Sequence, residues 1–203
     1  MIQSAEHWER HLPEGKYGVH LFPEFEKRAK DVSVEVIRVK TPAEAGKALL
    51  ELLRTLQAKK AVAANCPIQK TGEIHETIRN AGFQLFTDRA DIAEHASTAD
   101  VGISGVEFAV AETGSVCQNA TAIEERLVST LPPVHIVFLD SNRILPGIED
   151  AFELFSKVFD RGYISFITGP SRTADIERVL AIGVHGPSRV VLIAVDEAGK
   201  EGR

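Results

Sequence analysis

The segment from Glu112 to Ser115 is the first of two polar stretches whose residue types could act on a small molecule. It interrupts an otherwise apolar run. A buried carboxylate at Glu112 could serve as a general base or as a catalytic nucleophile, while Thr113, Gly114 and Ser115 could present amide and hydroxyl donors to a ligand. A turn at the end of a strand accounts for the same residues, so both interpretations stay open.

The loop that begins at Gly169 is the second polar stretch, and we expect it to connect a strand to a helix. Its candidate ligand-binding residues are Gly169, Pro170, Ser171, Arg172, Thr173 and Asp175. A glycine allows the backbone to approach a ligand closely, and Arg172 could place its planar fork against a carboxylate or a phosphate. At a helix N-terminus these groups would form an anion site. Because Asp175 would already lie against the positive end of that helix, plain helix capping is the alternative.

The tetrapeptide Gly-Pro-Ser-Arg occurs twice, at Gly169 and again at Gly186. The second copy precedes a strand pattern rather than a helix pattern. We therefore expect a turn there that orients His185 or Arg189, and we include His185 and Gly186 among the candidate ligand-binding residues.

Two further polar side chains have more than one interpretation. Arg126, also a candidate ligand-binding residue, could neutralise a bound ligand, or it could simply pair with Glu124 or Asp140. His135 stands among apolar residues in a strand that we expect to be central, which favours a hydrogen-bonded core histidine.

Several motifs with well-defined chemistry are absent from the chain. The sequence contains no G-x-x-x-x-G-K-[ST] loop, no G-x-G-x-x-G fingerprint, no G-x-S-x-G elbow and no H-E-x-x-H pair. Cys66 and Cys117 each stand alone, which provides neither a disulfide framework nor the ligands of a metal or iron–sulfur site. We therefore expect two buried thiols, no metal and no intrinsic cofactor.

Alternating strand and helix patterns from Val32 onward must position these residues. The run 134–140, VHIVFLD, is almost continuously apolar, as is typical of a strand covered on both faces. The stretch 107–117 is the least helix-like, and we expect it to pair with the preceding strand through a turn at Ser104 and Gly105. The spacing of apolar residues after Asp175 predicts a helix. Its apolar positions are Ile176, Val179 and Leu180, and it would end at Gly183.

This alternation predicts an α/β fold of three layers, with helices on both faces of a mainly parallel sheet. Residues 1–30 are predicted to form a short helical appendage, and residues 31–203 the main domain. In such a sheet, ligands gather beyond the carboxyl ends of the strands. We therefore expect the two polar stretches to converge at one rim of the sheet.

Composition excludes two classes of partner. The 203 residues include 29 Asp and Glu against 23 Lys and Arg, a net charge of −6 that argues against binding along a nucleic-acid backbone. No apolar stretch approaches the roughly 18 residues that a membrane span needs, and no N-terminal apolar targeting segment is present. We expect a cytoplasmic protein without a membrane span.

Three blocks of the sequence together carry a family resemblance. They read GISGVEFAVAETGSV, RLVSTLPPVHI and GPSRTADIERVLAIGVHGPSRV, and they lie within residues 100–195. In this order they resemble the LUD-domain family, specifically those members that serve lactate utilisation. The resemblance implies a NagB/RpiA/CoA-transferase-like fold. It also implies a role in oxidising L-lactate to pyruvate beside two partner proteins that carry iron–sulfur clusters.

The resemblance leaves the chemical role of the chain open. One hypothesis is an accessory component that binds a small carboxylate or a phosphorylated ligand in a cleft between the two polar stretches. The alternative is an autonomous enzyme of the sugar-phosphate isomerase or CoA-transferase type, with Glu112 as the catalytic residue. A third is a scaffold for the iron–sulfur partners.

Overall fold

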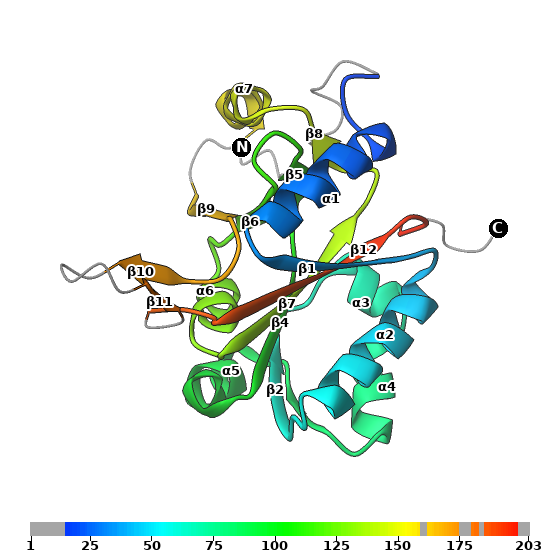
Figure 1. Cartoon of the computed structure of the whole chain (residues 1–203). Coiled ribbons are helices and arrows are strands. Elements are labelled where there is room, and N and C mark those ends of the chain that lie inside the picture. The colour runs from blue at the N-terminus through cyan, green and yellow to red at the C-terminus, as the bar shows by residue number, and fades with distance from the viewer. Residues whose placement is uncertain (1–14, 159–161, 175–179, 183–184, 199–203) are drawn as a thin grey trace.

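A six-stranded parallel sheet is the centre of the molecule (Figure 1). The computed structural model describes residues 15–158, 162–174, 180–182 and 185–198. The strand order is β1-β12-β7-β4-β2-β3, and every neighbouring pair is parallel. The strands are β1 (Val34–Val39), β2 (Lys60–Ala63), β3 (Gln84–Phe86), β4 (Val101–Gly105), β7 (Val134–Asp140) and β12 (Arg189–Val195). The apolar run 134–140 is an interior strand, which confirms its predicted central place.

Three helices cover one face of this sheet. They are α2 (Pro42–Thr55), α3 (Pro67–Thr71) and α4 (Ile74–Asn80). Helix α2 begins where Thr41 accepts a hydrogen bond from the amide of Glu44 at 3.3 Å, with Pro42 at the first helical position. Its residues Leu49 and Leu53 lie one turn apart and are completely buried against the strands.

The opposite face is covered by α1 (Phe22–Asp31), α5 (Arg89–His95) and α6 (Ile123–Thr130). Short 3₁₀ turns at Val19–Leu21 and Ala96–Thr98 adjoin the first two of these helices. Phe22, Phe25 and Ala29 form the buried stripe of α1, and they pack with strands β1, β7 and β12. Helices thus lie on both faces, as the alternation predicted. The proposed boundary between residues 1–30 and 31–203 stays a prediction.

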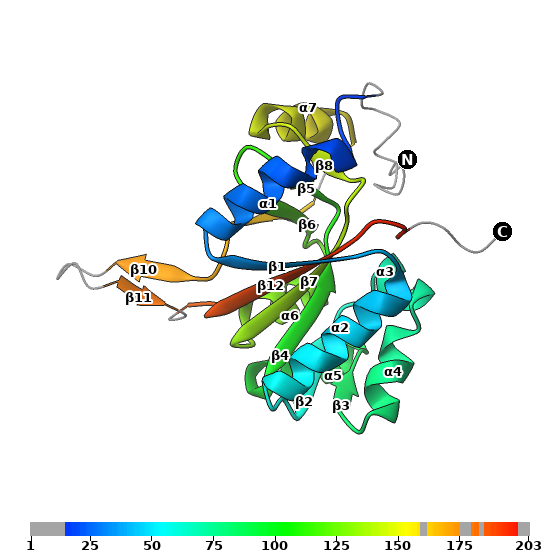
Figure 2. The ribbon, with the colours of Figure 1, turned by 45° about the vertical axis from the view of Figure 1, so that its right-hand side comes forward.

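A smaller four-stranded sheet, with order β8-β5-β6-β9, lies beside α1 (Figure 2). Its strands are β5 (Phe108–Val110), β6 (Ser115–Asn119), β8 (Ile144–Leu145) and β9 (Ile164–Ile167), and α7 (Ile148–Val158) packs on it. The predicted pairing of 107–117 with the preceding strand is wrong. Strand β4 pairs with β2 and β7, whereas β5 and β6 pair with each other. The physical reason is that β2 and β7 occupy both edges of β4, so its backbone has no free edge left for a third strand.

A two-stranded antiparallel hairpin, β10 (Arg172–Ala174) and β11 (Leu180–Ile182), projects from the body of the molecule (Figures 1 and 2). The predicted helix through Leu180 is wrong, because Leu180 pairs with Ala174 in this hairpin. So short a helix is marginal in water unless it packs its apolar face on a surface. Asp175, Ile176, Val179 and Gly183 lie outside the described residues.

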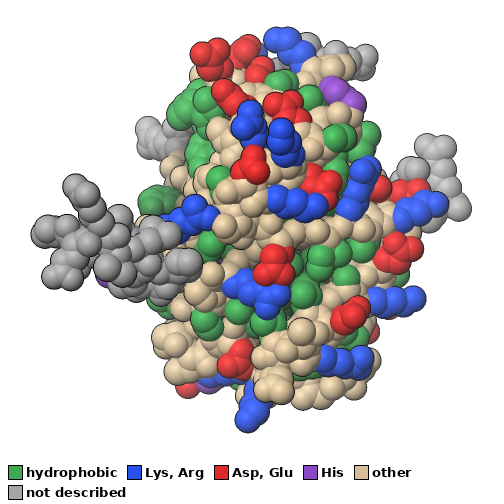
Figure 3. All heavy atoms as spheres, viewed as in Figure 1, with side chains coloured by type: hydrophobic (Ala, Val, Ile, Leu, Met, Phe, Trp, Pro, Cys, Tyr) green, Lys and Arg blue, Asp and Glu red, His purple; other side chains and the backbone are tan. Residues whose placement is uncertain are grey.

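The surface carries charges of both signs. Figure 3 shows acidic and basic side chains interspersed over the face that it displays. The absence of a nucleic-acid partner stays a prediction. Among the described residues, no helix is both long and apolar enough to cross a bilayer.

Candidate functional site

Glu112 lies in the turn between β5 and β6 and is exposed rather than buried. Its Oε2 accepts a hydrogen bond of 3.0 Å from the amide of Ile148, at the start of α7. The carboxylate therefore satisfies one of the free amides of that helix. In the same turn, Thr113 accepts a 3.4 Å hydrogen bond from the amide of Ser115. A catalytic role for Glu112 stays a prediction.

The two predicted polar stretches meet beside α1. The hydroxyl oxygens of Ser115 and Thr168 lie 2.7 Å apart, because β6 and β9 are neighbours in the small sheet. Gly114 has φ +67° and Gly169 has φ +81°, and an added Cβ at either position would overlap the backbone at the C-terminal end of α1 or just after it. Both glycines are therefore needed for close packing of the chain on itself.

The two Gly-Pro-Ser-Arg segments pair with each other at the neck of the β10–β11 hairpin. The amide of Ser171 donates a 2.8 Å hydrogen bond to the carbonyl oxygen of Pro187. An added Cβ at Gly186 would lie 3.2 Å from the Cβ of Ser171. Pro170 is buried, and His185 is exposed. The two copies of the motif thus contact each other in the folded chain.

Both arginines of the repeated motif contact the beginning of β1 or the loop before it. Arg172 donates a 2.5 Å hydrogen bond to the hydroxyl of Ser33, and Arg189 donates to Glu35, with one bond of 2.7 Å. Arg172 lies in a β-strand rather than at the start of a helix, so the described residues of this loop provide no helix N-terminus for an anion. The predicted ligand-binding role of this loop, Thr173 included, stays a prediction.

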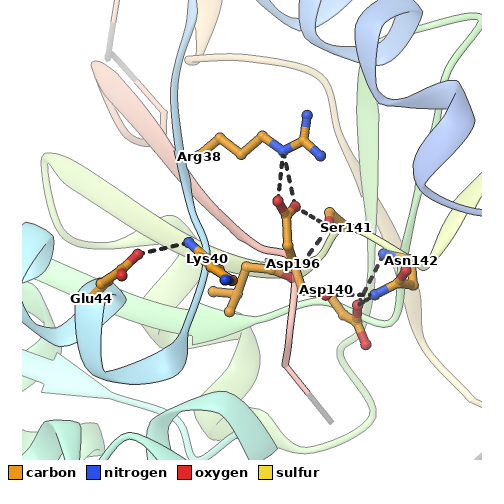
Figure 4. Close-up of polar contacts among 8 residues, drawn as sticks. Arg38, Lys40, Glu44, Asp140, Ser141, Asn142 and Asp196 are labelled. Atoms are coloured by element: carbon orange, nitrogen blue, oxygen red, sulfur yellow. Dashed lines mark hydrogen bonds and ion pairs between the residues drawn. The ribbon is translucent and has the colours of Figure 1, made fainter. Parts of the chain in front are cut away.

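The carboxyl ends of β1, β12 and β7 form a polar network whose groups bind one another (Figure 4). Asp196 accepts hydrogen bonds from Nε of Arg38 at 2.9 Å and from the hydroxyl of Ser141 at 2.6 Å. Asp140 accepts from both the amide and the side chain of Asn142, each at 2.9 Å. Because these carboxylates already have partners, this half of the sheet edge is structural.

The carboxyl ends of β2 and β4 form the other half of the edge, and they lie at a topological switch point. The chain leaves β2 for β3 on one side and leaves β4 for β7 on the other. Such points are where ligands bind in open parallel sheets. The end of β4 touches the loop that follows β2, since an added Cβ at Gly105 would lie 2.5 Å from the Cβ of Cys66.

A half-buried carboxyl group, Glu125 of α6, lies close to this switch point. It accepts a 2.9 Å hydrogen bond from Nε2 of Gln118. Burial raises the pKa of Glu125 to about 7, and nearby Glu107 and Glu124 add to the shift while the Gln118 hydrogen bond opposes it. Burial likewise raises the pKa of Cys66 to about 12, so its thiol stays protonated. Of these two groups, Glu125 is the one whose pKa lies near neutral pH.

His135 and Ser104 form a buried polar pair between β7 and β4. Nε2 of His135 lies 2.9 Å from the hydroxyl of Ser104, and both residues are completely buried. Burial lowers the pKa of His135 to about 4, so the ring is neutral at pH 7. The predicted hydrogen-bonded core histidine is confirmed.

Arg126 lies on α6, one residue after Glu125. Its guanidinium carbon is 5.1 Å from the centre of the Tyr163 ring, and its buried Nε has no hydrogen-bond partner. The two carboxylates considered for it have other partners: Glu124 lies 3.7 Å from Arg89, and Asp140 lies 3.8 Å from Arg143. Within the described part of the chain, no ion pair joins Arg126 to a carboxylate.

A cavity of about 660 Å³ opens beside Cys66, between α3 and the start of α4. Two of its lining residues, Gln69 and His75, each hold a buried nitrogen that lacks a hydrogen-bond partner. In the described residues, no cluster of three or more His, Cys, Asp or Glu side chains could hold a metal ion.

The residues at the switch point were not predicted from the sequence as site residues, and only Cys66 among them was singled out, as a thiol. A signal for them was nevertheless present. Asn65 and Cys66 come directly after the buried strand β2, and Glu107 comes two residues after β4. In a parallel sheet such positions gather at one edge, so the end of each predicted strand marks them.

Comparisons with known proteins agree on one family. The family model described as the LUD domain matches residues 22–195. The chain is 29% identical over 158 residues to "Lactate utilization protein C" of Anoxybacillus flavithermus, covering 72% of this chain and 71% of that protein. It is 34% identical over 115 residues to "Lactate utilization protein C 1" of Bacillus mycoides, covering 54% of this chain and 49% of that protein. The match thus spans about half the length of the latter relative.

A solved structure shares the fold. It is the crystal structure of a DUF162 family protein from Deinococcus radiodurans, with a TM-score of 0.60 and 18% identity. The similarity covers 90% of this chain and 99% of that one. At this level of identity the comparison supports the α/β architecture and nothing finer.

Proposed function

The chain belongs to the LUD-domain family, and on this premise we propose that it is a component of an L-lactate utilisation system. In that system L-lactate is oxidised to pyruvate in the cytoplasm, and partner proteins carry the iron–sulfur clusters. Relatives named lactate utilization protein C support this role. The isolated cysteines Cys66 and Cys117 are consistent with placing those clusters on the partners. The parallel sheet and its small companion sheet support the finer assignment to a NagB/RpiA/CoA-transferase-like fold.

The contribution of this chain is to bind a small carboxylate, and the observation that carries this proposal is that no carboxylate of the described residues pairs with the guanidinium of Arg126. The Tyr163 ring lies 5.1 Å from the guanidinium carbon and restricts its motion. The buried Nε has no partner. A planar guanidinium can donate two parallel N–H hydrogen bonds to the two oxygens of a carboxylate, which suits lactate and pyruvate. Glu125, the adjacent residue, could exchange a proton with a ligand held there.

Binding of ¹³C-labelled lactate and pyruvate, measured by NMR titration of the full chain, tests the proposal. Replacing Arg126→Gln removes a charge-assisted interaction of about 1.5–3 kcal/mol, so affinity should fall roughly 10- to 100-fold. Arg54→Gln is the matched control, because Arg54 is an exposed arginine at the end of α2. The proposal fails if neither acid binds, or if Arg126→Gln binds as well as the control.

The alternative, an autonomous enzyme that uses Glu112 on a phosphosugar or a CoA ester, has one observation in its favour. The Glu112 carboxylate is exposed and so is accessible to a substrate, although it also contacts the amide of Ile148. Turnover by the isolated chain that disappears in Glu112→Gln would favour this alternative over the binding role.

A further inference from the structure

The cavity beside Cys66 is large compared with a three-carbon acid. Its volume is about 660 Å³, within the range of about 300–1,000 Å³ that is typical of sites for cofactor-sized ligands. It opens at the carboxyl end of β2, next to β4, where the chain connections diverge. Doubly wound parallel sheets bind nucleotides at such a point.

Gln69 lines this cavity, and its side-chain amide holds two N–H donors in the buried wall. Its Oε1 accepts a 3.0 Å hydrogen bond from the amide of Cys66, and this bond fixes which end of the side-chain amide is the oxygen. Its Nε2 is therefore the free end, and it is buried without a partner in a residue that is only 2% exposed. A buried amide without an acceptor is costly, so a ligand oxygen at this position would be stabilising.

The other polar groups of the cavity complement different parts of one ligand. Nε2 of His75 is also buried without a partner, and burial lowers the pKa of this ring, so it is neutral. Lys70 contributes a cation to the lining. Glu73 and Glu76 contribute exposed carboxylates, which are the groups that accept hydrogen bonds from ribose hydroxyls in dinucleotide sites.

We infer that this cavity binds a nucleotide. Gln69 and His75 bond to the polar edge of the base, Glu73 or Glu76 accepts from the ribose hydroxyls, and Lys70 pairs with a phosphate. The site is separate from the carboxylate site proposed at Arg126. It adds a second ligand of a different class to the proposed function.

The inference is tested by isothermal titration of the full chain with ADP, FMN and NADH. At least one of them should bind. Gln69→Glu keeps an acceptor for the Cys66 amide but removes both N–H donors, so affinity should fall at least 10-fold. Gln84→Glu makes the same change at an exposed position of β3 and should have no effect. Lys70→Gln should weaken ADP while leaving adenosine unchanged.

Two results would overturn the inference: no binding of any of the three nucleotides at 1 mM, or equal affinities in Gln84→Glu and in both cavity variants. If Gln69→Glu does not fold, Lys70→Gln decides the question alone, by its effect on ADP relative to adenosine. Lactate titrations of the same variants separate the two proposals. If lactate binding is lost only in Arg126→Gln and no nucleotide binds to the wild type, the carboxylate site is supported and the nucleotide site is rejected.

Discussion

Replacing Gly169 with alanine tests whether this glycine serves packing rather than ligand binding. Gly169 has φ +81°, a backbone conformation that costs an alanine about 1–2 kcal/mol. In addition, the new Cβ would overlap the carbonyl oxygen of Val32 and lie 3.2 Å from its carbonyl carbon. The atoms in the way belong to the backbone after α1, which cannot rotate aside as a flexible side chain can.

The expected loss of stability follows from these two contributions. Overpacking costs typically about 1–3 kcal/mol, so Gly169→Ala should lower the free energy of unfolding by about 2–5 kcal/mol. With a urea m-value of about 2 kcal/mol per M, a loss of about 3 kcal/mol lowers the midpoint by about 1.5 M.

Gly82→Ala is the matched control for urea unfolding followed by circular dichroism. Gly82 has φ +88°, but no atom lies within 4 Å of its would-be Cβ. It therefore carries the conformational cost alone, about 1–2 kcal/mol. Equal losses in the two variants would refute the packing explanation for Gly169.

Three further predictions concern charged and titratable groups, each measured by urea unfolding. The free energy of unfolding of Glu125→Gln should match that of the wild type near pH 4.5 and exceed it by up to about 3 kcal/mol above pH 7. The reason is that a folded-state pKa raised to about 7 makes the wild type lose stability as pH rises through that window. Equal unfolding curves of the two proteins at pH 8 would contradict this. His135 acts in the opposite direction, because its folded-state pKa of about 4 lies below the unfolded value. Its neutral ring contributes about 3 kcal/mol to the free energy of unfolding above pH 6.5, and this contribution is lost as pH falls toward 4. The free energy of unfolding of His135→Gln should therefore fall less over that range than that of the wild type. Glu112→Ala should cost about 1 kcal/mol, since the Ile148 amide loses its acceptor; no loss would argue against the capping role.

Local signals predicted most of the elements between residues 32 and 168. The helix that starts after Thr41, and the interior strand at 134–140, both follow from residue types within a few positions of each other. Capping and hydrophobic periodicity are local properties, so they can be recognised without knowing the tertiary contacts. The same local signals gave a wrong prediction at Leu180, because the pattern around it fits a helix while residues 172–174 and 180–182 pair as two strands.

The candidate site was predicted less well than the fold. The sequence identified Arg126 as one of the candidate ligand residues, but only the structure shows that no carboxylate in the described part of the chain pairs with its guanidinium. The unpaired nitrogens of Gln69 and His75 are not visible in the sequence at all. A side chain is unpaired only relative to everything packed around it, and that depends on neighbours from other elements.

The sequence by itself determined the family, the α/β alternation and the interior position of the strand at 134–140, because residue order and periodicity are written along the chain. Tertiary structure alone decided that β4 joins the main sheet and that Cys66 packs on Gly105. It also decided that the two Gly-Pro-Ser-Arg segments bind each other. These features depend on which segments, distant in the sequence, pack against each other. The free energy of that packing is a property of the whole fold rather than of any one segment.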